Sequence, residues 1–346
     1  MHAALKVLSL SLALALAACA TGPKPDPKIA FADAPFEVIV FGDTPYTAAD
    51  EAMLARALPV VKAVNPSFVL HVGDFQSGGD VCGSHDTRFQ SLVNALAPLP
   101  VIYTPGDNEW TDCDRQIDPA TGKPFSELKR LDTLRHLFFG REVTVPATMI
   151  YKRARSLPEN ARLDYAGVIV VTVNVSGTNN GRDAVMGDDL HKAARAADQR
   201  DKANVRWLNA AFDRAKKLKA KSVIVVMQAD ITHPLTEPPC RDAVSKRTDN
   251  QCDGFYFVRQ SLIANAQSFG KPVLLIHGDT DPFTLTHGDF GVANLWRLNA
   301  AGDAGINATT QQPYGVVDVT HLTIDLSKPM PFKASGLLTQ TQPNSK

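Results

Sequence analysis

Four short apolar runs that each end in Gly-Asp constrain this chain more than any other feature of its sequence. The four pairs are Gly42-Asp43, Gly73-Asp74, Gly106-Asp107 and Gly278-Asp279. The preceding runs are rich in Val and Ile and mostly continuous in apolar character, which is typical of strands buried on both faces. Eight Gly-Asp pairs occur in all, whereas 22 Gly and 29 Asp among 346 residues predict about two. The sequence therefore indicates buried strands that end in turns carrying a carboxylate.

Helical patterns alternate with the apolar runs. Residues 48–64 and 204–218 have helical spacing, and the second segment has an apolar stripe that includes Leu208 and Phe212. This alternation predicts an α/β sheet. Residues 316–326 alternate between apolar and polar side chains and are expected at a sheet edge. The predicted buried strands are 37–41, 67–72, 101–103, 167–175, 222–227 and 272–276.

Composition narrows the possible classes of protein. Apolar residues make up 44% and charged residues 21%, which is typical of a globular chain. The 36 basic and 36 acidic residues leave no net charge to attract nucleic acid, so none is predicted as a partner, and any polyanionic partner would need a local basic site. The chain contains no Gly-x-Ser-x-Gly elbow, Walker loop or Gly-x-Gly-x-x-Gly turn, which disfavours serine hydrolases, P-loop proteins and dinucleotide-binding proteins.

The first residues have the character of an export signal. Residues 7–18 form an apolar run that is too short to span a bilayer, and Leu16-Ala17-Ala18-Cys19 follows the pattern of a bacterial lipoprotein signal. We therefore expect residues 1–18 to be removed and Cys19 to be lipidated; an ordinary secretory signal is the alternative. The lipid would attach an exported protein to a bacterial membrane, with Ala20 favouring the outer membrane and a periplasmic or cell-surface location. Residues 19–35 are expected to be a Pro-rich tether, 36–333 the folded domain and 334–346 a disordered tail.

Four further cysteines, Cys82, Cys113, Cys240 and Cys252, are an even number in a chain expected to be exported. This favours two disulfides, for which three pairings exist. The pairs Cys82–Cys113 and Cys240–Cys252 are favoured because their members are close in sequence. A zinc site made of all four is the alternative, although no Cys-x-x-Cys spacing occurs.

The strand-end carboxylates are expected to converge, because ligands of open α/β sheets bind beyond the carboxyl ends of the strands. Buried carboxylates that share a crevice repel one another unless they gain protons or a positive partner. No Lys or Arg stands in these segments. Bound divalent cations are therefore the expected partners.

In their order along the chain, these motifs resemble those of the calcineurin-like metallophosphoesterases, which include purple acid phosphatases. The resemblance covers residues 36 to about 332. It implies an α/β two-sheet sandwich flanked by helices in four layers, and two divalent metal ions with a bridging hydroxide that hydrolyses a small phosphate mono- or diester. Asp74 would bridge the ions and Asn108 would align the phosphate, which makes these two the candidate catalytic residues. The candidate metal ligands are Asp43, Tyr46, Asp74, Asp107, Gln228, Asp279 and Asp281.

Several positions differ from the family pattern. Asp107 stands where the family has Asn, Asn108 where it has its catalytic His, and Gln228, Asp279 and Asp281 where it has ligating His residues. An oxygen-rich shell favours Mn²⁺, Mg²⁺ or Ca²⁺ over Zn²⁺, with Fe or Zn still possible. His277 is the favoured additional nitrogen ligand, ahead of His71 and His233.

Because of these differences from the family motifs, the sequence is also compatible with functions other than phosphoester hydrolysis. Asn108 can donate a hydrogen bond but cannot act as a general acid. One alternative is a non-catalytic, cation-binding surface lipoprotein on a degenerate phosphoesterase fold, and another is an unrelated α/β protein whose Asp turns are only structural. Asn174, Asn179 and Asn180 are candidates for substrate contacts, although a structural turn at residues 179–181 is favoured.

Overall fold

The computed structural model describes residues 34–345, apart from 234, 248–250, 281, 303 and 307–312; for 304–306 and 313–314 it describes only the backbone. The expected signal, Cys19 and Asp281 therefore lie outside the described residues. Within the described part of the chain, no helix has the length and apolar character needed to cross a membrane.

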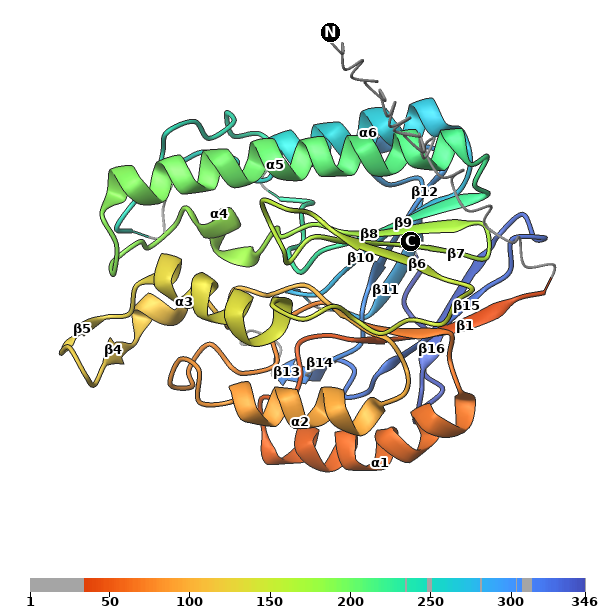
Figure 1. Ribbon diagram of the computed structural model, residues 1–346, viewed down its shortest axis with the longest axis horizontal. Coiled ribbons are helices and arrows are strands. Elements are labelled where there is room, and N and C mark those ends of the chain that lie inside the picture. Colours follow the sequence, from red (N-terminus) through yellow and green to blue (C-terminus); the bar gives the residue numbers. More distant parts are fainter. Residues whose placement is uncertain are drawn as a thin grey trace, which may run out of the picture.

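Two sheets form the centre of the protein (Figure 1). In the first, β1, β2 and β3 are parallel, β15 pairs antiparallel with β1, and β16 pairs antiparallel with β15. In the second, β8, β9, β10 and β12 are parallel, and β6 and β7 form one edge. The first sheet has the order β16 (Phe332–Gly336), β15 (Thr320–Ile324), β1 (Phe36–Phe41), β2 (Phe68–His71) and β3 (Val101–Tyr103). The second has the order β11 (Thr284–His287), β12 (Leu295–Asn299), β10 (Val273–His277), β9 (Ser222–Val226), β8 (Val168–Thr172), β7 (Ala161–Tyr165) and β6 (Ile150–Arg153).

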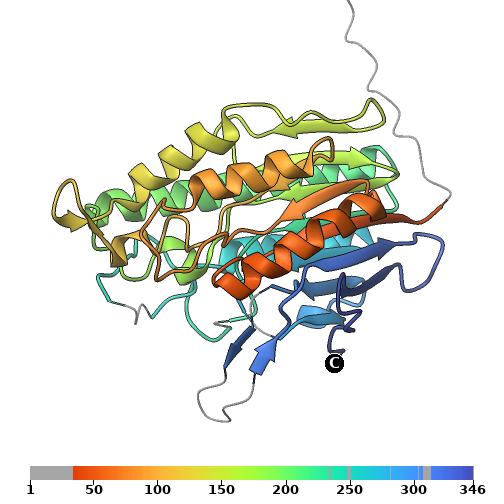
Figure 2. The ribbon, with the colours of Figure 1, turned by 90° about the horizontal axis from the view of Figure 1, so that it is seen from below.

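Helices cover the outer face of each sheet. Helices α1 (Ala48–Val64) and α2 (Asp86–Leu96) lie together on the five-stranded sheet (Figure 2), and α5 (Leu190–Lys217) and α6 (Tyr256–Phe269) lie on the seven-stranded sheet. The predicted four-layer α/β sandwich is thus confirmed. The remaining elements are short: η1 (Cys113–Arg115), β4 (Ile117–Asp118), β5 (Lys123–Pro124), α3 (Glu127–Leu134), η2 (Arg135–Phe139), α4 (Gly177–Gly181), η3 (Asp289–Gly291), β13 (Ala304–Ile306) and β14 (Pro313–Gly315).

The continuous apolar runs have a direct structural explanation. In β8, Val168 and Val170 face the core between the sheets, whereas Ile169 and Val171 face the core beneath α5 and α6. Side chains on a strand alternate between its two faces, so a strand in the middle of a four-layer sandwich needs apolar residues at every position.

The helix predictions succeeded where local signals were strong. Helix α1 has the predicted bounds, with a capping box between Thr47 and Asp50 at its start and Asn65 in the left-handed conformation at its end. The prediction of 204–218 captured only the second half of α5. Its first half, from the Asp189 cap, buries mainly small residues such as Ala193 and Ala197, which give a weak apolar pattern.

The disordered tail predicted for residues 334–346 is wrong for the part that the structure describes. Phe332 and Ala334 in β16 enter the core between the sheets. Farther on, the Asn344 backbone pairs with the second sheet, donating to Phe283 O at 2.9 Å and accepting from Leu285 N at 3.0 Å. The polar tail is ordered by main-chain pairing, for which its side-chain composition gives no signal.

Candidate metal centre

Carboxylates from both sheets meet beyond the strand ends. Asp74 follows β2, Asp107 follows β3 and Asp279 follows β10. One oxygen from each lies within 4.8 Å of the others, and among the described residues these three form the single group of acidic, His or Cys side chains with this spacing. We call Asp74, Asp107 and Asp279 the acid cluster. Asp74 and Asp107 are buried, whereas Asp279 is partly exposed, so the cluster has a side open to solvent.

The Gly-Asp turns bring these side chains together through their backbone conformation. Asp43, Asp74 and Asp279 adopt left-handed conformations, with φ of 48°, 57° and 72°. Asp residues tolerate this region better than most because a short polar side chain can bond locally. A Cβ on Gly106 would collide with the Asp74 carboxylate, and one on Gly278 would collide with that of Asp43. The glycines therefore permit the close approach of the turns.

Asp43 joins the cluster indirectly. Its Oδ1 accepts a hydrogen bond from the Asp279 backbone N–H at 2.9 Å, which ties the turn after β1 to the turn after β10. Its charge also raises the pKa of Asp279. The structure thus brings four of the predicted Asp ligands to one edge.

The Gln228 side chain contacts all three members of the acid cluster. Its Nε2 lies 3.0 Å from Asp74 Oδ2, 2.9 Å from Asp107 Oδ1 and 3.1 Å from Asp279 Oδ1. Its Oε1 accepts a hydrogen bond from the Gly177 N–H at 2.6 Å, which fixes the orientation of the amide. Gln228 therefore directs N–H groups at the carboxylates, so in this arrangement it is a hydrogen-bond donor and not an oxygen ligand.

Tyr46 and Asn108 lie at the partly exposed side of the cluster. The Tyr46 hydroxyl donates to Asp74 Oδ2 at 3.3 Å and accepts from Asn108 Nδ2 at 3.1 Å. Burial, followed by the charges of Asp74 and Asp43, raises the pKa of Tyr46 well above its usual value. Tyr46 is therefore a neutral phenol and a donor in this arrangement, and its role as a metal ligand stays a prediction.

Glu109 is a site residue that the sequence reasoning missed. Its buried carboxylate accepts from the backbone N–H groups of Asp74, Phe75 and Gly106 at 2.9, 3.3 and 3.2 Å, and from the Tyr103 hydroxyl at 3.2 Å. It thus joins the turn after β2 to the turn after β3. Its place three residues after Gly106 was visible in the sequence, but its backbone partners depend on how the two turns lie in space.

A left-handed turn at α4 borders the acid cluster. Thr178, Asn179 and Asn180 have φ of 53°, 52° and 58° with ψ near 43°, a conformation that costs roughly 1–2 kcal/mol for each residue other than Gly. Thr178 Oγ1 donates to Asp107 Oδ2 at 3.2 Å, and a Cβ on Gly177 would collide with Asp107 and Asp279. The turn predicted at residues 179–181 is therefore confirmed, and it closes one side of the cluster.

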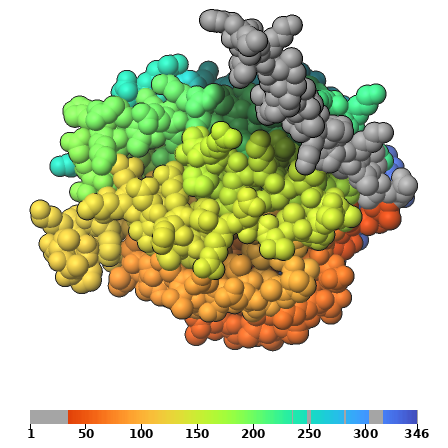
Figure 3. All heavy atoms as spheres, in the orientation of Figure 1, coloured from red at the N-terminus to blue at the C-terminus, as the bar shows by residue number. Residues whose placement is uncertain are grey.

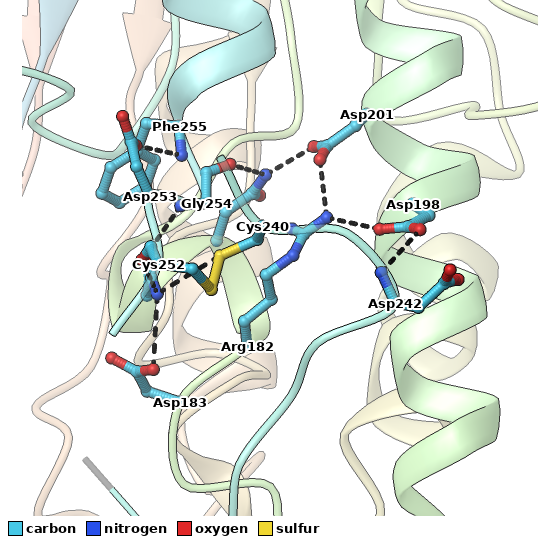
Figure 4. Close-up of a disulfide and its surroundings, with 12 residues drawn as sticks. Arg182, Asp183, Asp198, Asp201, Cys240, Asp242, Cys252, Asp253, Gly254 and Phe255 are labelled. Carbon is cyan, nitrogen blue, oxygen red and sulfur yellow. Dashed lines mark hydrogen bonds and ion pairs between the residues drawn. A yellow bond between two sulfur atoms is a disulfide. The ribbon is translucent and has the colours of Figure 1, made fainter. Parts of the chain in front are cut away.

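Hydrogen bonds and a disulfide hold this turn (Figure 4). Asn179 donates to Cys252 O at 2.9 Å and accepts from Gly254 N at 2.7 Å. Arg182 contacts Asp198 and Asp201 at 3.0 and 2.6 Å nearby. The disulfides join Cys82 to Cys113 and Cys240 to Cys252, which is the favoured pairing and contradicts the four-cysteine zinc site.

The structure does not place histidines in the acid cluster. His277 is buried with its Nδ1 2.7 Å from Gly278 O and its Nε2 3.0 Å from Arg297 Nη1. His277 ends β10, and its two ring nitrogens contact Gly278 O and Arg297 of the adjacent β12, so they are not among the atoms that make up the acid cluster. His71 accepts from Gly73 N and packs among aromatic rings, and His233 is exposed.

The electrostatics of the cluster favour a bound cation. Burial raises the pKa of Asp74 and Asp107, and the neighbouring carboxylates raise both further. Burial and the Asp43 charge raise the pKa of Asp279 to about 7. Such carboxylates lose their negative charge unless a positive partner compensates for it. Three carboxylate oxygens at this spacing fit a hard divalent cation, whereas the Gln228 amide would have to turn its oxygen toward the ion to act as a ligand.

The fold and the acid cluster define an α/β sandwich with a candidate cation site at the strand ends. Residues 36–153 match the family model of the calcineurin-like phosphoesterases, which confirms the resemblance predicted from the motifs over this part of the chain. The matched segment includes Asp43, Asp74 and Asp107.

Solved structures resemble the chain at low sequence identity. One described as GAP50, the anchor in the inner membrane complex of Plasmodium, is 11% identical, with 90% of this chain and 89% of that chain covered and a TM-score of 0.46. A dimetal phosphatase from Danio rerio is 10% identical, with 83% and 95% covered and a TM-score of 0.46. PhoD is 12% identical, with 90% and 67% covered and a TM-score of 0.49. A search of curated protein sequences found no match.

Proposed function

We propose that this protein hydrolyses phosphate mono- or diesters with the help of divalent cations held at the acid cluster. The observation that carries the proposal is the convergence of Asp74, Asp107 and Asp279 from two sheets within 4.8 Å. The family match over residues 36–153 supports it. Asp43 and Asp281 remain candidate ligands for a second ion.

The bound cations, the acid cluster and the polar side chains beside it have separate roles in the proposed reaction. Divalent cations supply charge neutralisation and an activated water when bound. The acid cluster holds the cation, and Asp74 is positioned by the backbone of Asn108, whose N–H lies 3.2 Å from Asp74 Oδ1. At the exposed side, the Asn108 amide has a second N–H for a phosphate oxygen, whereas the Tyr46 hydroxyl already donates to Asp74. Neither is a ready proton donor to a leaving group, so esters with acidic alcohols, such as aryl phosphates, are the expected good substrates.

We also propose that the protein acts outside the inner membrane as a lipid-anchored protein. The lipoprotein pattern around Cys19 and the two disulfides support this location. Small, water-soluble phosphate esters are the substrates that this arrangement favours.

A second candidate function is cation binding without catalysis. The observation that favours it is the Gln228 amide, which already gives each of the three carboxylates a hydrogen-bond donor. Asn108 stands where the family has a catalytic His, which also favours cation binding without catalysis.

Hydrolysis assays on the chain from Ala20 onward distinguish the two functions. This chain keeps every member of the four hydrophobic clusters, which begin at Phe36, so it retains the whole core. An aryl phosphate monoester and diester would be offered with Mn²⁺, Mg²⁺, Ca²⁺ or Zn²⁺, beside Asp74→Asn. Metal-dependent turnover that the variant loses while staying folded is expected. A folded protein that binds cations without any turnover would establish the second function.

A further inference from the structure

A basic surface lies along the free edge of the seven-stranded sheet, away from the acid cluster. Two neighbouring hollows of about 380 and 440 Å³ share Lys152 of the edge strand β6. Together their lining contains seven cationic side chains and one carboxylate, Asp213. We call this the basic face. Its cations are Lys152, Arg153, Arg155, Arg162, Arg206, Arg214 and Lys217.

The basic face contrasts with the balanced charge of the whole chain, which has 36 basic and 36 acidic residues. Lys152, Arg155 and Arg206 are exposed, and none of the three forms an ion pair with another described residue. Arg162 and Arg214 instead share the buried Asp164, at 2.8 and 3.0 Å. The face therefore combines cations fixed by a buried carboxylate with cations directed into solvent.

Protection of a sheet edge explains only part of this charge. Lysines on edge strands discourage strand pairing between molecules, and Lys152 fits that role. Arg155 lies in the loop after β6 and Arg206 lies on α5, so neither blocks an edge. Figure 3 shows the side of the molecule on which the yellow-green β6–β7 segment adjoins the green α5.

The basic face lies next to the N-terminal end of the described chain. Phe36, the first residue of β1, packs edge-to-face against Tyr165 at the end of β7, with ring centroids 5.2 Å apart. Arg162 lies three residues before Tyr165 and pairs with Lys152, which places this pair roughly 10 Å from Tyr165 along the strand. Arg155, three residues beyond Lys152, lies farther from Phe36. A lipid attached at Cys19, as the sequence predicts, would bring this side of the domain to the membrane.

We propose that the basic face docks on the anionic phospholipid surface of the membrane that carries the lipid anchor. Phosphate headgroups complement the charge of Lys152, Arg155 and Arg206, and clustered cations beside a lipidated segment add the second signal that firm membrane attachment needs. The docking does not depend on the phosphoesterase function, because no member of the acid cluster belongs to the face.

Vesicle co-sedimentation of the unlipidated chain from Ala20 onward tests the proposal. We expect binding to vesicles of phosphatidylcholine mixed with phosphatidylglycerol, no binding to phosphatidylcholine alone, and release by added salt. The triple variant Lys152→Gln, Arg155→Gln, Arg206→Gln should bind roughly 100-fold more weakly, from about 1 kcal/mol for each cation at the surface.

The matched control carries Arg56→Gln, Lys62→Gln and Lys333→Gln, three exposed cations outside the face, and should bind like the parent chain. Arg155→Lys with Arg206→Lys should also retain binding, because charge and not guanidinium geometry is required. Thermal unfolding identifies any variant that fails to fold. Equal loss in the control triple, undiminished binding by the face triple, or binding to duplex DNA without binding to anionic vesicles would each overturn the proposal.

Discussion

Asp279 gives the acid cluster a dependence on pH that can be measured without turnover. Its pKa is raised to about 7 from an ordinary value of 3.8, first by burial and then by the Asp43 charge. Between these values the folded chain keeps a proton that the unfolded chain has released. The stabilising contribution of this group is therefore complete below about pH 4 and is lost as the pH rises through about 7 in the metal-free protein.

Asp279→Asn should remove the part of this dependence that comes from Asp279, while Asp74 and Asp107 keep raised pKa values through burial. With chelator present, we expect the variant to exceed the parent chain in unfolding free energy by on the order of 2 kcal/mol at about pH 8, and by little at about pH 4. Added Mg²⁺ or Mn²⁺ should stabilise the parent chain more than the variant. Urea unfolding at the two pH values measures both effects, and His71 contributes equally to each protein. Identical pH profiles would show that Asp279 does not titrate in this way.

Glu109 is expected to stabilise the site through its backbone contacts. Glu109→Gln would turn an N–H group toward backbone N–H donors and leave at least one buried donor without an acceptor, which costs about 1–3 kcal/mol. Denaturant unfolding should show this loss, together with weaker cation binding. The exposed Glu142→Gln is the matched control and should change stability by less than about 0.5 kcal/mol.

The sequence allowed the carboxylates to be identified but not the orientation of the groups around them. Asp74, Asp107 and Asp279 each follow a buried run, and strand-end position alone predicts that they meet. The role of Gln228 depends on one hydrogen bond from Gly177, which lies 51 residues away along the chain. No local pattern records such a contact.

The left-handed turn of α4 is the element that shapes the cluster most directly. Gly177 is not among the residues with positive φ, so Ala is permitted by its backbone and would act only through its methyl group. That methyl group would collide with Asp107 and Asp279. We expect Gly177→Ala to weaken Mn²⁺ binding by at least about tenfold, or roughly 1.4 kcal/mol.

Calorimetric titration with Mn²⁺ would measure the effect of Gly177→Ala. Gly79→Ala is its control, because a Cβ there would meet only Ser77 Oγ at 3.7 Å. Unchanged affinity in Gly177→Ala would mean that the turn yields easily and does not shape the site.

Elements with strong local signals were predicted well, and elements defined by their neighbours were missed. β1 is a nearly continuous apolar run, and α1 has clear capping residues at both ends. β6 has the sequence IYKR and β7 the sequence ARLDY, which combine charged and apolar residues without a distinct period. β7 pairs with β8, and β6 pairs with β7 at the edge of the sheet. Both strands are therefore stabilised by pairing with a neighbouring strand and not by a pattern within their own sequence.

At the scale of the whole molecule, the C-terminal segment connects the two sheets. β16 belongs to the five-stranded sheet, and Asn344 pairs with the backbone of Phe283 and Leu285 beside β11 of the other sheet. Deletion of residues 337–346 should therefore lower the unfolding temperature by several degrees, since it removes these bonds and the buried Leu337.

Thermal unfolding followed by circular dichroism would check this prediction. Gln342→Ala, which changes an exposed side chain of the same segment, is the control and should unfold with the parent chain. An unaltered transition in the deletion variant would show that the segment adds nothing to the stability of the sandwich.

The direction of β1 has a consequence for where substrates must be found. Phe36 and Asp43 lie at opposite ends of this buried strand, a separation of roughly 20 Å. An anchor that holds the chain through its N-terminal side therefore pulls at the end opposite the acid cluster. If the basic face also rests on the bilayer, the cluster opens parallel to the membrane plane and not down into it. In this second arrangement, an ester dissolved in the surrounding water approaches the carboxylates from beside the membrane.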